Sequence, residues 1–373
     1  MRKELVSQIR RVVVKVGSGV IFGGNGVDES VIKGISTDIC ELVRQGYEVL
    51  LVTSGAVATG KGDLGIVGRP PTIPLKQAAA AIGQSRLMRY YKDAFREHNR
   101  VVAQILLTRD DLANRRRFLN ARNTLMTLLE YGVTPIINEN DTVVVDEIRF
   151  GDNDNLSALV TSLAEADLLV ILSDVDGLFD SNPKKNSAAR LIPLVEQITS
   201  EIEAMAGGAG SDVGTGGMST KIEAAKRATL YGVGTVIVNG RLPGVLPRIL
   251  AGEEVGTWFR AVPDRLKARK HWIAFTKKTR GVLYVDDGAR RALLEKGKSL
   301  LPRGVARIEG PFDRGDAVRI CDLEGHELAR GVIGYSRQEL ALIIGRKSSE
   351  IEQVLGYKYG DEVVHRDNLV LTQ

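Results

Sequence analysis

The sequence predicts an α/β domain, with a parallel or mixed sheet covered by helices, followed by a smaller β-rich domain. From residue 11 to about 240, short β-branched runs alternate with amphipathic helical patterns. Beyond about residue 265, glycine-rich turns separate short strands, which suits a small barrel with one or two helices. A chain of 373 residues is long enough for two hydrophobic cores.

The strands of the first domain are expected in β-branched runs. A helix opened by Asp28 as its N-cap should follow the first strand, because its apolar residues recur at 3-and-4 spacing. The expected strands are Arg11–Val16, Glu48–Thr53, Val101–Leu107, Val133–Asn138, Asp167–Leu172, Thr235–Asn239 and a short one at Trp258-Phe259. We expect a catalytic domain at 1–262, a basic linker at 263–272 and the second domain at 273–373.

Composition indicates a globular protein, with 43% hydrophobic and 26% charged residues. Lys15 interrupts the first apolar run well before the length of a signal peptide or a membrane span, so we expect a cytoplasmic protein without membrane contact. Cys40 and Cys321 have no second Cys or His at metal-ligand spacing, so neither a disulfide nor a structural zinc site is expected.

The net charge of +5 is unevenly distributed. Residues 1–259 carry 29 basic and 30 acidic side chains, whereas residues 260–270 carry five basic side chains and one acidic one. Such a short basic run indicates either a solvated connection or a contact with RNA or an acidic partner.

Polar and glycine-containing segments follow the ends of the predicted strands. Ligands of open α/β sheets bind at the carboxyl ends of the strands, where helix N-termini offer free N–H groups to anions. Each segment alone is also consistent with a tight turn or a hydrated loop, but together they indicate a polar ligand. The segments are Lys15–Ser18, Thr53–Ala56, Asn138–Asp141, Gly151–Asp154 and Ser173–Phe179. A hairpin is expected at Val143–Arg149, and a helix is expected from about Asn155 to Ala166.

The sharpest feature is the glycine-rich loop Gly214–Lys221, which leads into a predicted helix at Ile222–Tyr231. Successive N–H groups of such a loop can bind phosphate oxygens, with Lys221 as the counter-charge. The Gly-x-x-x-x-Gly-Lys-Ser/Thr order of P-loop enzymes is absent, as are the protein kinase and Gly-x-Ser-x-Gly hydrolase signatures. No histidine lies near these loops, so histidine acid–base catalysis has no candidate.

These motifs, in this order, resemble the glutamate 5-kinases, a branch of the amino acid kinase family. The tail, with Leu301–Val305 and Gly315–Val318, looks like a PUA domain. The resemblance implies a three-layer α/β/α sandwich that uses ATP and Mg²⁺ to phosphorylate the γ-carboxylate of L-glutamate. It also implies the first step of proline biosynthesis, feedback inhibition by proline and a homo-oligomer, dimer or tetramer.

The resemblance also implies roles for individual residues. Lys15 and Lys221 would contact the phosphates and the transition state, and Asp154 would orient both lysines. At position 173 this sequence has serine, where threonine is common in the family. The resemblance does not identify a protein ligand for Mg²⁺. Glutamate would be held by Ser54, Asn138, Asp141 and Asn153, and ATP by Lys15, Ser173, Asp174, Thr215, Gly216, Gly217, Met218, Ser219, Thr220 and Lys221.

The residue types suit this reaction, because a glutamate side chain with a pKa of about 4.3 is already ionised at neutral pH and needs no general base. Related kinases acting on acetylglutamate, aspartate or a nucleoside monophosphate are alternatives, although the acidic loop at Asn138–Asp141 favours a substrate with an ammonium group. RNA binding by the tail is a further alternative. Residues 271–373 hold 17 basic and 15 acidic side chains, and this balance argues against it.

Overall fold

The structure is a computed structural model that describes residues 2–23, 26–68, 70–143, 152–183, 186–207, 217–261 and 279–372. The chain forms two compact units that divide near residue 262. The basic linker expected at 263–272 lies outside the described residues, as does most of a hairpin expected at Val143–Arg149.

The first unit is built on an eight-stranded sheet with the order β5-β6-β4-β1-β7-β9-β10-β8. The strands from β5 to β9 are parallel, and β10 runs antiparallel to β9. The strands are β1 Arg11–Val16, β4 Glu48–Thr53, β5 Val102–Leu107, β6 Thr134–Glu139, β7 Leu168–Ser173, β8 Leu194–Val195, β9 Gly234–Asn239 and β10 Thr257–Phe259, with a separate hairpin of β2 Phe22–Gly23 and β3 Gly26–Val27.

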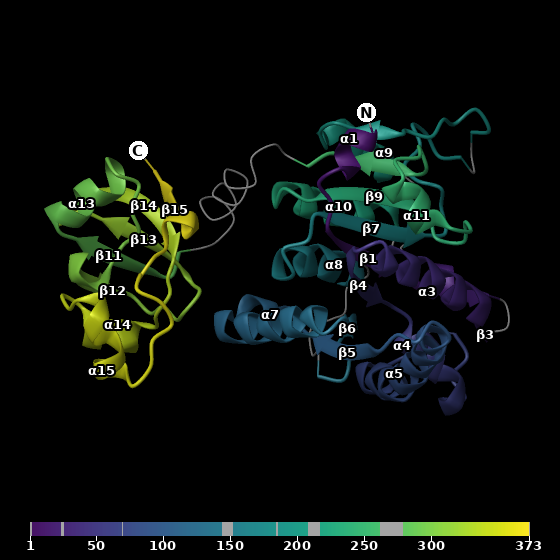
Figure 1. The fold of residues 1–373 in the computed structure, drawn as a ribbon, viewed down its shortest axis with the longest axis horizontal. Coiled ribbons are helices and arrows are strands. Elements are labelled where there is room, and N and C mark those ends of the chain that lie inside the picture. Colours follow the sequence, from purple (N-terminus) through teal and green to yellow (C-terminus); the bar gives the residue numbers. More distant parts are fainter. Residues whose placement is uncertain are drawn as a thin grey trace. The chain divides into compact units, whose positions relative to one another are not determined.

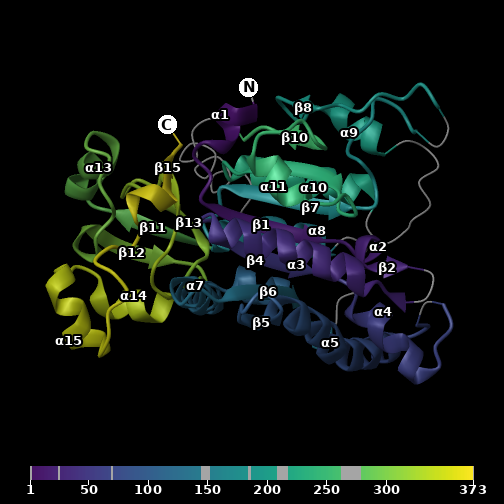
Figure 2. The ribbon, with the colours of Figure 1, turned by 45° about the vertical axis from the view of Figure 1, so that its right-hand side comes forward.

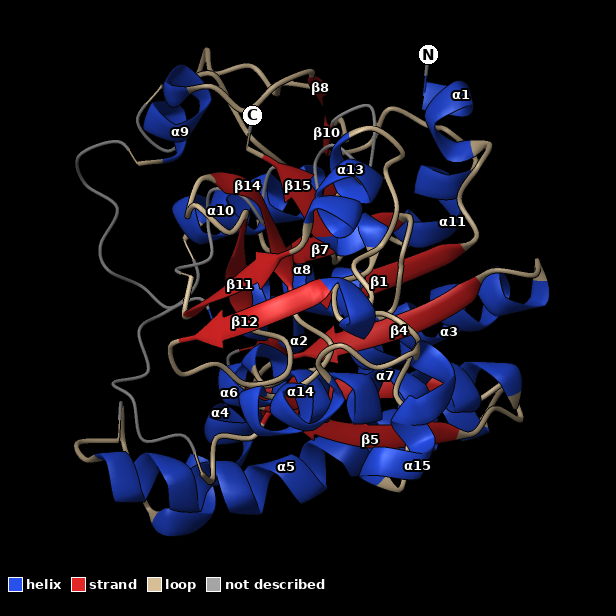
Figure 3. Ribbon diagram, turned by 90° about the vertical axis from the view of Figure 1, so that its left-hand side faces the viewer, coloured by secondary structure: helices blue, strands red, loops and turns tan. Residues whose placement is uncertain are grey.

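Helices cover both faces of this sheet and make three layers. Helices α3, α5 and α11 pack side by side on one face, and α8 and α10 pack together on the other (Figures 1 and 2). The strands cross the unit between these helices (Figure 3). The helices are α1 Arg2–Val6, α2 Ser18–Ile21, α3 Glu29–Arg44, α4 Ala56–Gly60, α5 Ile73–Arg96, α6 Arg109–Ala113, α7 Arg115–Glu130, α8 Asp152–Leu163, α9 Ser200–Ala206, α10 Met218–Leu230 and α11 Val245–Leu250.

The sequence patterns explain why the central elements form. The valines of β1 are fully buried, because helices cover the sheet on both sides. The side chain of Asp28 accepts a hydrogen bond from the Val31 amide and caps α3. The apolar stripe of α3, which includes Ile32 and Ile39, faces the core.

Most predicted elements coincide with observed ones. The bounds predicted for β1 and β4 are those observed, and the other predicted parallel strands of the sheet agree within one residue at each end. Helix α8 begins at Asp152 rather than near residue 155. The strand β8 and the 24-residue helix α5 were not predicted.

Two glycines allow α4 and α5 to cross in close contact. A Cβ atom at Gly83 would lie 1.8 Å from the carbonyl oxygen of Ala56, and one at Gly60 would lie 2.1 Å from that of Ala79. Both contacts are with backbone, which has little room to move. The crossing therefore fixes α4, which begins directly after the loop that contains Ser54.

We expect Gly83→Ala to lower the free energy of unfolding by about 1–3 kcal/mol, because an added methyl group at a filled backbone contact forces the helices apart. Urea unfolding followed by circular dichroism would measure the change. The matched control is Gly34→Ala on α3, where a Cβ would meet nothing within 4 Å. The control should be neutral or stabilising by up to about 1 kcal/mol, and an equal loss in both variants would contradict the expectation.

The second unit contains a five-stranded sheet with the order β12-β11-β13-β14-β15. Within residues 279–372, three α-helices accompany this sheet, where the sequence indicated one or two, and the hydrophobic core of this unit is separate from that of the first unit. The elements are β11 Gly281–Val285, α13 Asp287–Leu294, β12 Val305–Glu309, β13 Ala317–Cys321, β14 Glu327–Val332, α14 Arg337–Ile343, α15 Ile351–Leu355 and β15 Leu369–Leu371.

Candidate active site

The parallel strands of the first unit bring the predicted site segments to one edge of the sheet. In register, Val16 lies beside Thr53 on one side and beside Leu172 on the other. Ser173 in turn lies beside Asn239. The segments that follow β1, β4, β6 and β7 therefore start from the same edge.

The centre of the site is an ion-paired triad, Lys15, Asp154 and Lys221. The ammonium of Lys15 lies 2.6 Å from Oδ1 of Asp154, and that of Lys221 lies 3.7 Å from Oδ2. Asp154 is 1% exposed and each lysine 5% exposed, so all three charges are almost removed from water. Two lysines that are 206 positions apart in the sequence thus share one buried carboxylate.

Burial and the neighbouring charges shift the pKa values of Asp154 and Lys221. Burial raises the pKa of Asp154, but the charges of Lys15 and Lys221 and the hydrogen bonds from Lys15 and Thr220 outweigh it, and the pKa lies below its usual value. Burial lowers the pKa of Lys221, Lys15 adds to this effect, and Asp154 and Asp174 offset only part of it. Asp154 is consequently held as a carboxylate at neutral pH.

Thr220 connects the triad to the start of α10. Its hydroxyl lies 2.8 Å from Oδ2 of Asp154 and also 2.8 Å from the carbonyl oxygen of Gly217. Gly217 is the N-cap of α10 and offers no side-chain cap. The N–H groups in the first turn of such a helix can bind an anion, here next to the side chain of Lys221.

A chain of amide groups lies beside the triad. Nδ2 of Asn153 donates to Oγ of Ser54 at 3.0 Å and to Oδ1 of Asn138 at 3.1 Å. Nδ2 of Asn138 donates to Oε1 of Gln84 at 2.7 Å. Three of the residues expected to bind glutamate thus form one network, and Gln84 from α5 is a member that the sequence analysis missed.

A cavity of about 270 Å³ opens next to this network. Gln84 lies in its wall together with Glu139 and Asp141, and Ala56 of α4 lines it as well. The structure therefore places Asp141, the fourth residue expected to bind glutamate, in the same cavity as Gln84. A cavity with two carboxylates in its wall suits a ligand that carries an ammonium group.

The remaining residues expected to bind ATP are only partly described. The hydroxyl of Ser173 donates to Oδ1 of Asp174 at 3.2 Å, directly after β7. Met218 and Ser219 lie in the first turn of α10. Thr215 and Gly216 lie outside the described residues.

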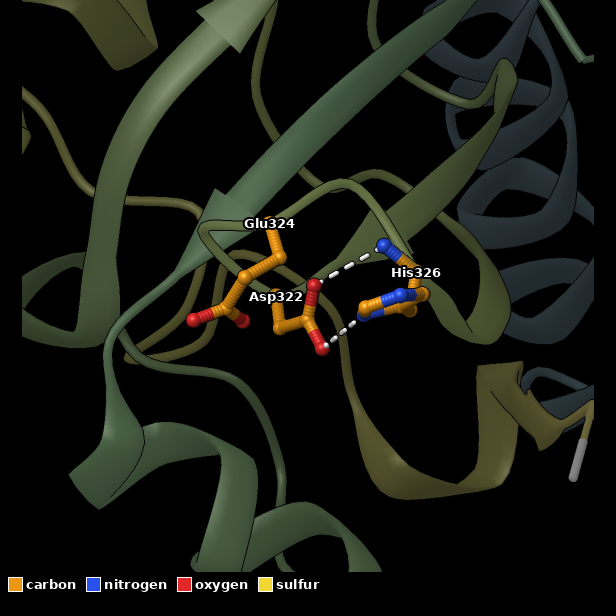
Figure 4. Close-up of side chains that lie close together, drawn as sticks. All are labelled: Asp322, Glu324 and His326. Atoms are coloured by element: carbon orange, nitrogen blue, oxygen red, sulfur yellow. Dashed lines mark hydrogen bonds and ion pairs between the residues drawn. The ribbon is translucent and has the colours of Figure 1, made fainter.

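One group of possible metal ligands lies in the second unit. Asp322, Glu324 and His326 have ligand atoms within 4.8 Å of one another. Oδ1 of Asp322 accepts from the backbone N–H of His326, and Oδ2 lies 3.1 Å from Nδ1 of the same residue (Figure 4). These contacts close the turn between β13 and β14. The buried Asp322 therefore has a structural role in the turn.

Among the described helices, none is both long and apolar enough to cross a membrane. Residues 10–239 match the model of the amino acid kinase family, and residues 281–355 match that of the PUA domain.

Full-length relatives narrow this assignment. The glutamate 5-kinase of Syntrophotalea carbinolica is 75% identical over 371 residues, and that of Geobacter sulfurreducens is 59% identical over 372 residues, with 100% of each chain covered. The carbamate kinase of Giardia lamblia, bound to AMP-PNP, has a similar fold, with a TM-score of 0.50 at 19% identity over 69% of this chain and 100% of its own. The chain belongs to the amino acid kinase family and, within it, to the glutamate 5-kinases that carry a C-terminal PUA domain.

Proposed function

We propose that the protein transfers the γ-phosphoryl group of ATP to the γ-carboxylate of L-glutamate and forms γ-glutamyl phosphate. The observation that carries this proposal is the buried triad of Lys15, Asp154 and Lys221. The names of the full-length relatives support the choice of substrate.

The main obstacle to this reaction is electrostatic. An ionised carboxylate must approach a polyanionic phosphate, and two like charges about 4 Å apart repel by about 4 kcal/mol at an effective dielectric constant of about 20. Cations and N–H dipoles that are already in place offset this repulsion without reorganisation. Lys15, Lys221 and the first turn of α10 are such groups.

Asp154 holds the two lysines in position. Its carboxylate binds both ammonium groups and the hydroxyl of Thr220. The two positive charges are thereby held close together despite their mutual repulsion. Transfer proceeds directly in line, and a general base is unnecessary because the attacking oxygen is already ionised.

Magnesium fits this site as a companion of the nucleotide. Asp154 is occupied by the two lysines, so it is a poor candidate for a metal ligand. Asp174 is a better candidate to face a metal held by phosphates. Its carboxylate follows β7, is exposed, and lies close enough to Lys221 for its charge to raise the pKa of that lysine. When bound, the metal neutralises phosphate charge.

The proposal is tested by incubating the purified protein with ATP, magnesium, hydroxylamine and one acid at a time. Hydroxylamine converts an acyl phosphate to a hydroxamate. We expect hydroxamate with glutamate, and much less with acetylglutamate or aspartate. Formation of hydroxamate with one of the other acids alone would assign the enzyme to a different substrate.

We expect Asp141→Ala to raise the KM for glutamate by about 10-fold or more while kcat changes little. The reason is that Asp141 lies in the cavity wall and would bind the α-ammonium group in the ground state and the transition state equally. Initial rates of hydroxamate formation give both constants. An unchanged KM would remove Asp141 from glutamate binding.

Other features follow from family membership and are expectations. They are a cytoplasmic location, the first step of proline biosynthesis, a homo-oligomeric state and inhibition by proline. RNA binding by the PUA domain is not part of the proposal, because the near balance of charge in residues 271–373 does not favour it.

A further inference from the structure

The amide chain beside the triad has a direction that is fixed by one backbone group. The N–H of Glu139 donates to the side chain of Asn138 at 2.9 Å. Since a backbone N–H can only donate, the receiving atom of Asn138 is its oxygen, Oδ1. The amide nitrogen of Asn138 therefore points the other way, toward Gln84.

This direction determines how Gln84 is oriented. Nδ2 of Asn138 needs an acceptor, so the atom of Gln84 that faces it at 2.7 Å is Oε1. The other end of the Gln84 amide is then Nε2, a donor. Only 9% of Gln84 is exposed, and among the residues that the structure describes Nε2 has no hydrogen-bond partner.

The other end of the chain is oriented too. Nδ2 of Asn153 donates to Ser54 and to Asn138, which leaves Oδ1 of Asn153 as a buried acceptor without a partner among the described residues. The chain thus presents an acceptor beside the triad and a donor at Gln84. A buried donor without a partner costs free energy of folding. We therefore take Nε2 of Gln84 as a candidate hydrogen-bond donor to a ligand.

The position of Gln84 indicates which part of the substrate it meets. Asn153 precedes Asp154 in the first turn of α8, so its end of the chain starts from the same helical turn as the carboxylate that binds the two lysines. Gln84 lies two hydrogen bonds away, in the wall of the 270 Å³ cavity. Its cavity neighbours Glu139 and Asp141 attract an ammonium group but repel a carboxylate. A carboxylate in this cavity therefore needs a donor.

We propose that Nε2 of Gln84 donates a hydrogen bond to the α-carboxylate of the amino-acid substrate, so that Gln84 selects for acids carrying a second carboxylate. This inference rests on the proposed function, because it takes the γ-carboxylate to be the group at the lysines. Gln84 is in this sense a specificity-determining residue at the end of the substrate remote from the transferred phosphoryl group.

The test compares three substrates that differ by one group. Glutarate is glutamate without the ammonium group, and 4-aminobutyrate is glutamate without the α-carboxylate. In Gln84→Met, we expect kcat/KM to fall by about 10- to 100-fold for glutamate and glutarate, mainly through KM, because a hydrogen bond to a charged group is lost. For 4-aminobutyrate it should change less than twofold. If glutarate or 4-aminobutyrate is turned over too slowly, its inhibition constant against glutamate phosphorylation can be compared between the variant and the wild type instead.

Two further variants separate the donor from the structural role of the side chain. Gln84→Glu keeps an oxygen that accepts from Asn138 but removes the donor, so it should lose at least as much activity on glutamate as Gln84→Met. Gln45→Met, at an exposed position after α3, is the matched control and should behave as the wild type.

The outcomes are distinct. Equal losses for all three substrates, or normal glutamate kinetics in Gln84→Glu, would overturn the proposal for Gln84 while wild-type activity on glutamate remains. A wild-type protein that forms no hydroxamate with glutamate would instead overturn the proposed function itself.

Discussion

Replacing Lys221 with alanine should lower kcat by about 100- to 1,000-fold and leave the KM for glutamate within about threefold of the wild-type value. Removal of one preorganised charge-stabilising group from a buried site commonly costs a factor of about 100 to 1,000. Lys221 is 5% exposed, and its ammonium group, held beside Asp154, would offset the charge that develops on the phosphates during the reaction. Most of its contribution therefore belongs to the transition state.

Rates of hydroxamate formation at saturating ATP would measure this effect, with circular dichroism to verify folding. Lys226→Ala is the matched control, since Lys226 lies on the same helix with 48% of its side chain exposed, paired with Glu203 on the surface. We expect the control to keep wild-type turnover. A Lys221→Ala enzyme with normal kcat, or one whose only defect is a raised KM, would remove Lys221 from the transition state.

Replacing Asp154 with asparagine should damage both stability and turnover. The two ammonium groups would remain buried without a counter-charge, and breaking a buried ion pair from one side costs about 3–5 kcal/mol. We expect kcat to fall by at least about 100-fold, because the lysines lose the carboxylate that holds them together. Urea unfolding and hydroxamate formation would measure the two losses.

The pH dependence gives an independent check. The pKa of Asp154 is lowered in the folded protein, so its carboxylate stabilises the fold above the ordinary pKa of 3.8, and this contribution is lost as the pH falls through the lowered value. The stability difference between wild type and Asp154→Asn should therefore shrink in acid. Asp63→Asn, which breaks a surface pair with Arg86, is the control and should cost at most about 1 kcal/mol. Similar losses in both variants would contradict a buried, charge-pairing role for Asp154.

The strands were predictable where a strand is buried on both faces. Such strands are continuous β-branched runs, and in β1 and β4 a polar or charged residue marks the start. The two-residue strand β8 carries no such signal, because it is held by pairing with β10 at the edge of the sheet. The start of α8 was placed about three residues late, since Asn153 and Asp154 resemble a cap in sequence but lie in its first turn.

The site was predictable to the extent that it lies in loops at strand ends. Gln84 was missed because it lies on a helix with no motif around it. A signal was present nevertheless: Ala80, Leu87 and Tyr91 are buried on the same face of α5, and Gln84 falls at the matching helical spacing. A buried polar residue on an apolar helix face needs a hydrogen-bond partner, and this requirement makes such a residue a candidate for the site.

The amide chain differs from the lysine–aspartate triad in one further respect. Ser54, Asn153, Asn138 and Gln84 neither gain nor lose a proton across the physiological range, and the group that sets their direction is a peptide N–H. The hydrogen bonds that we propose between this network and the substrate should therefore not depend on pH through the titration of these side chains. Any change of glutamate affinity between pH 6 and 9 must come from the substrate or from the charged groups around it.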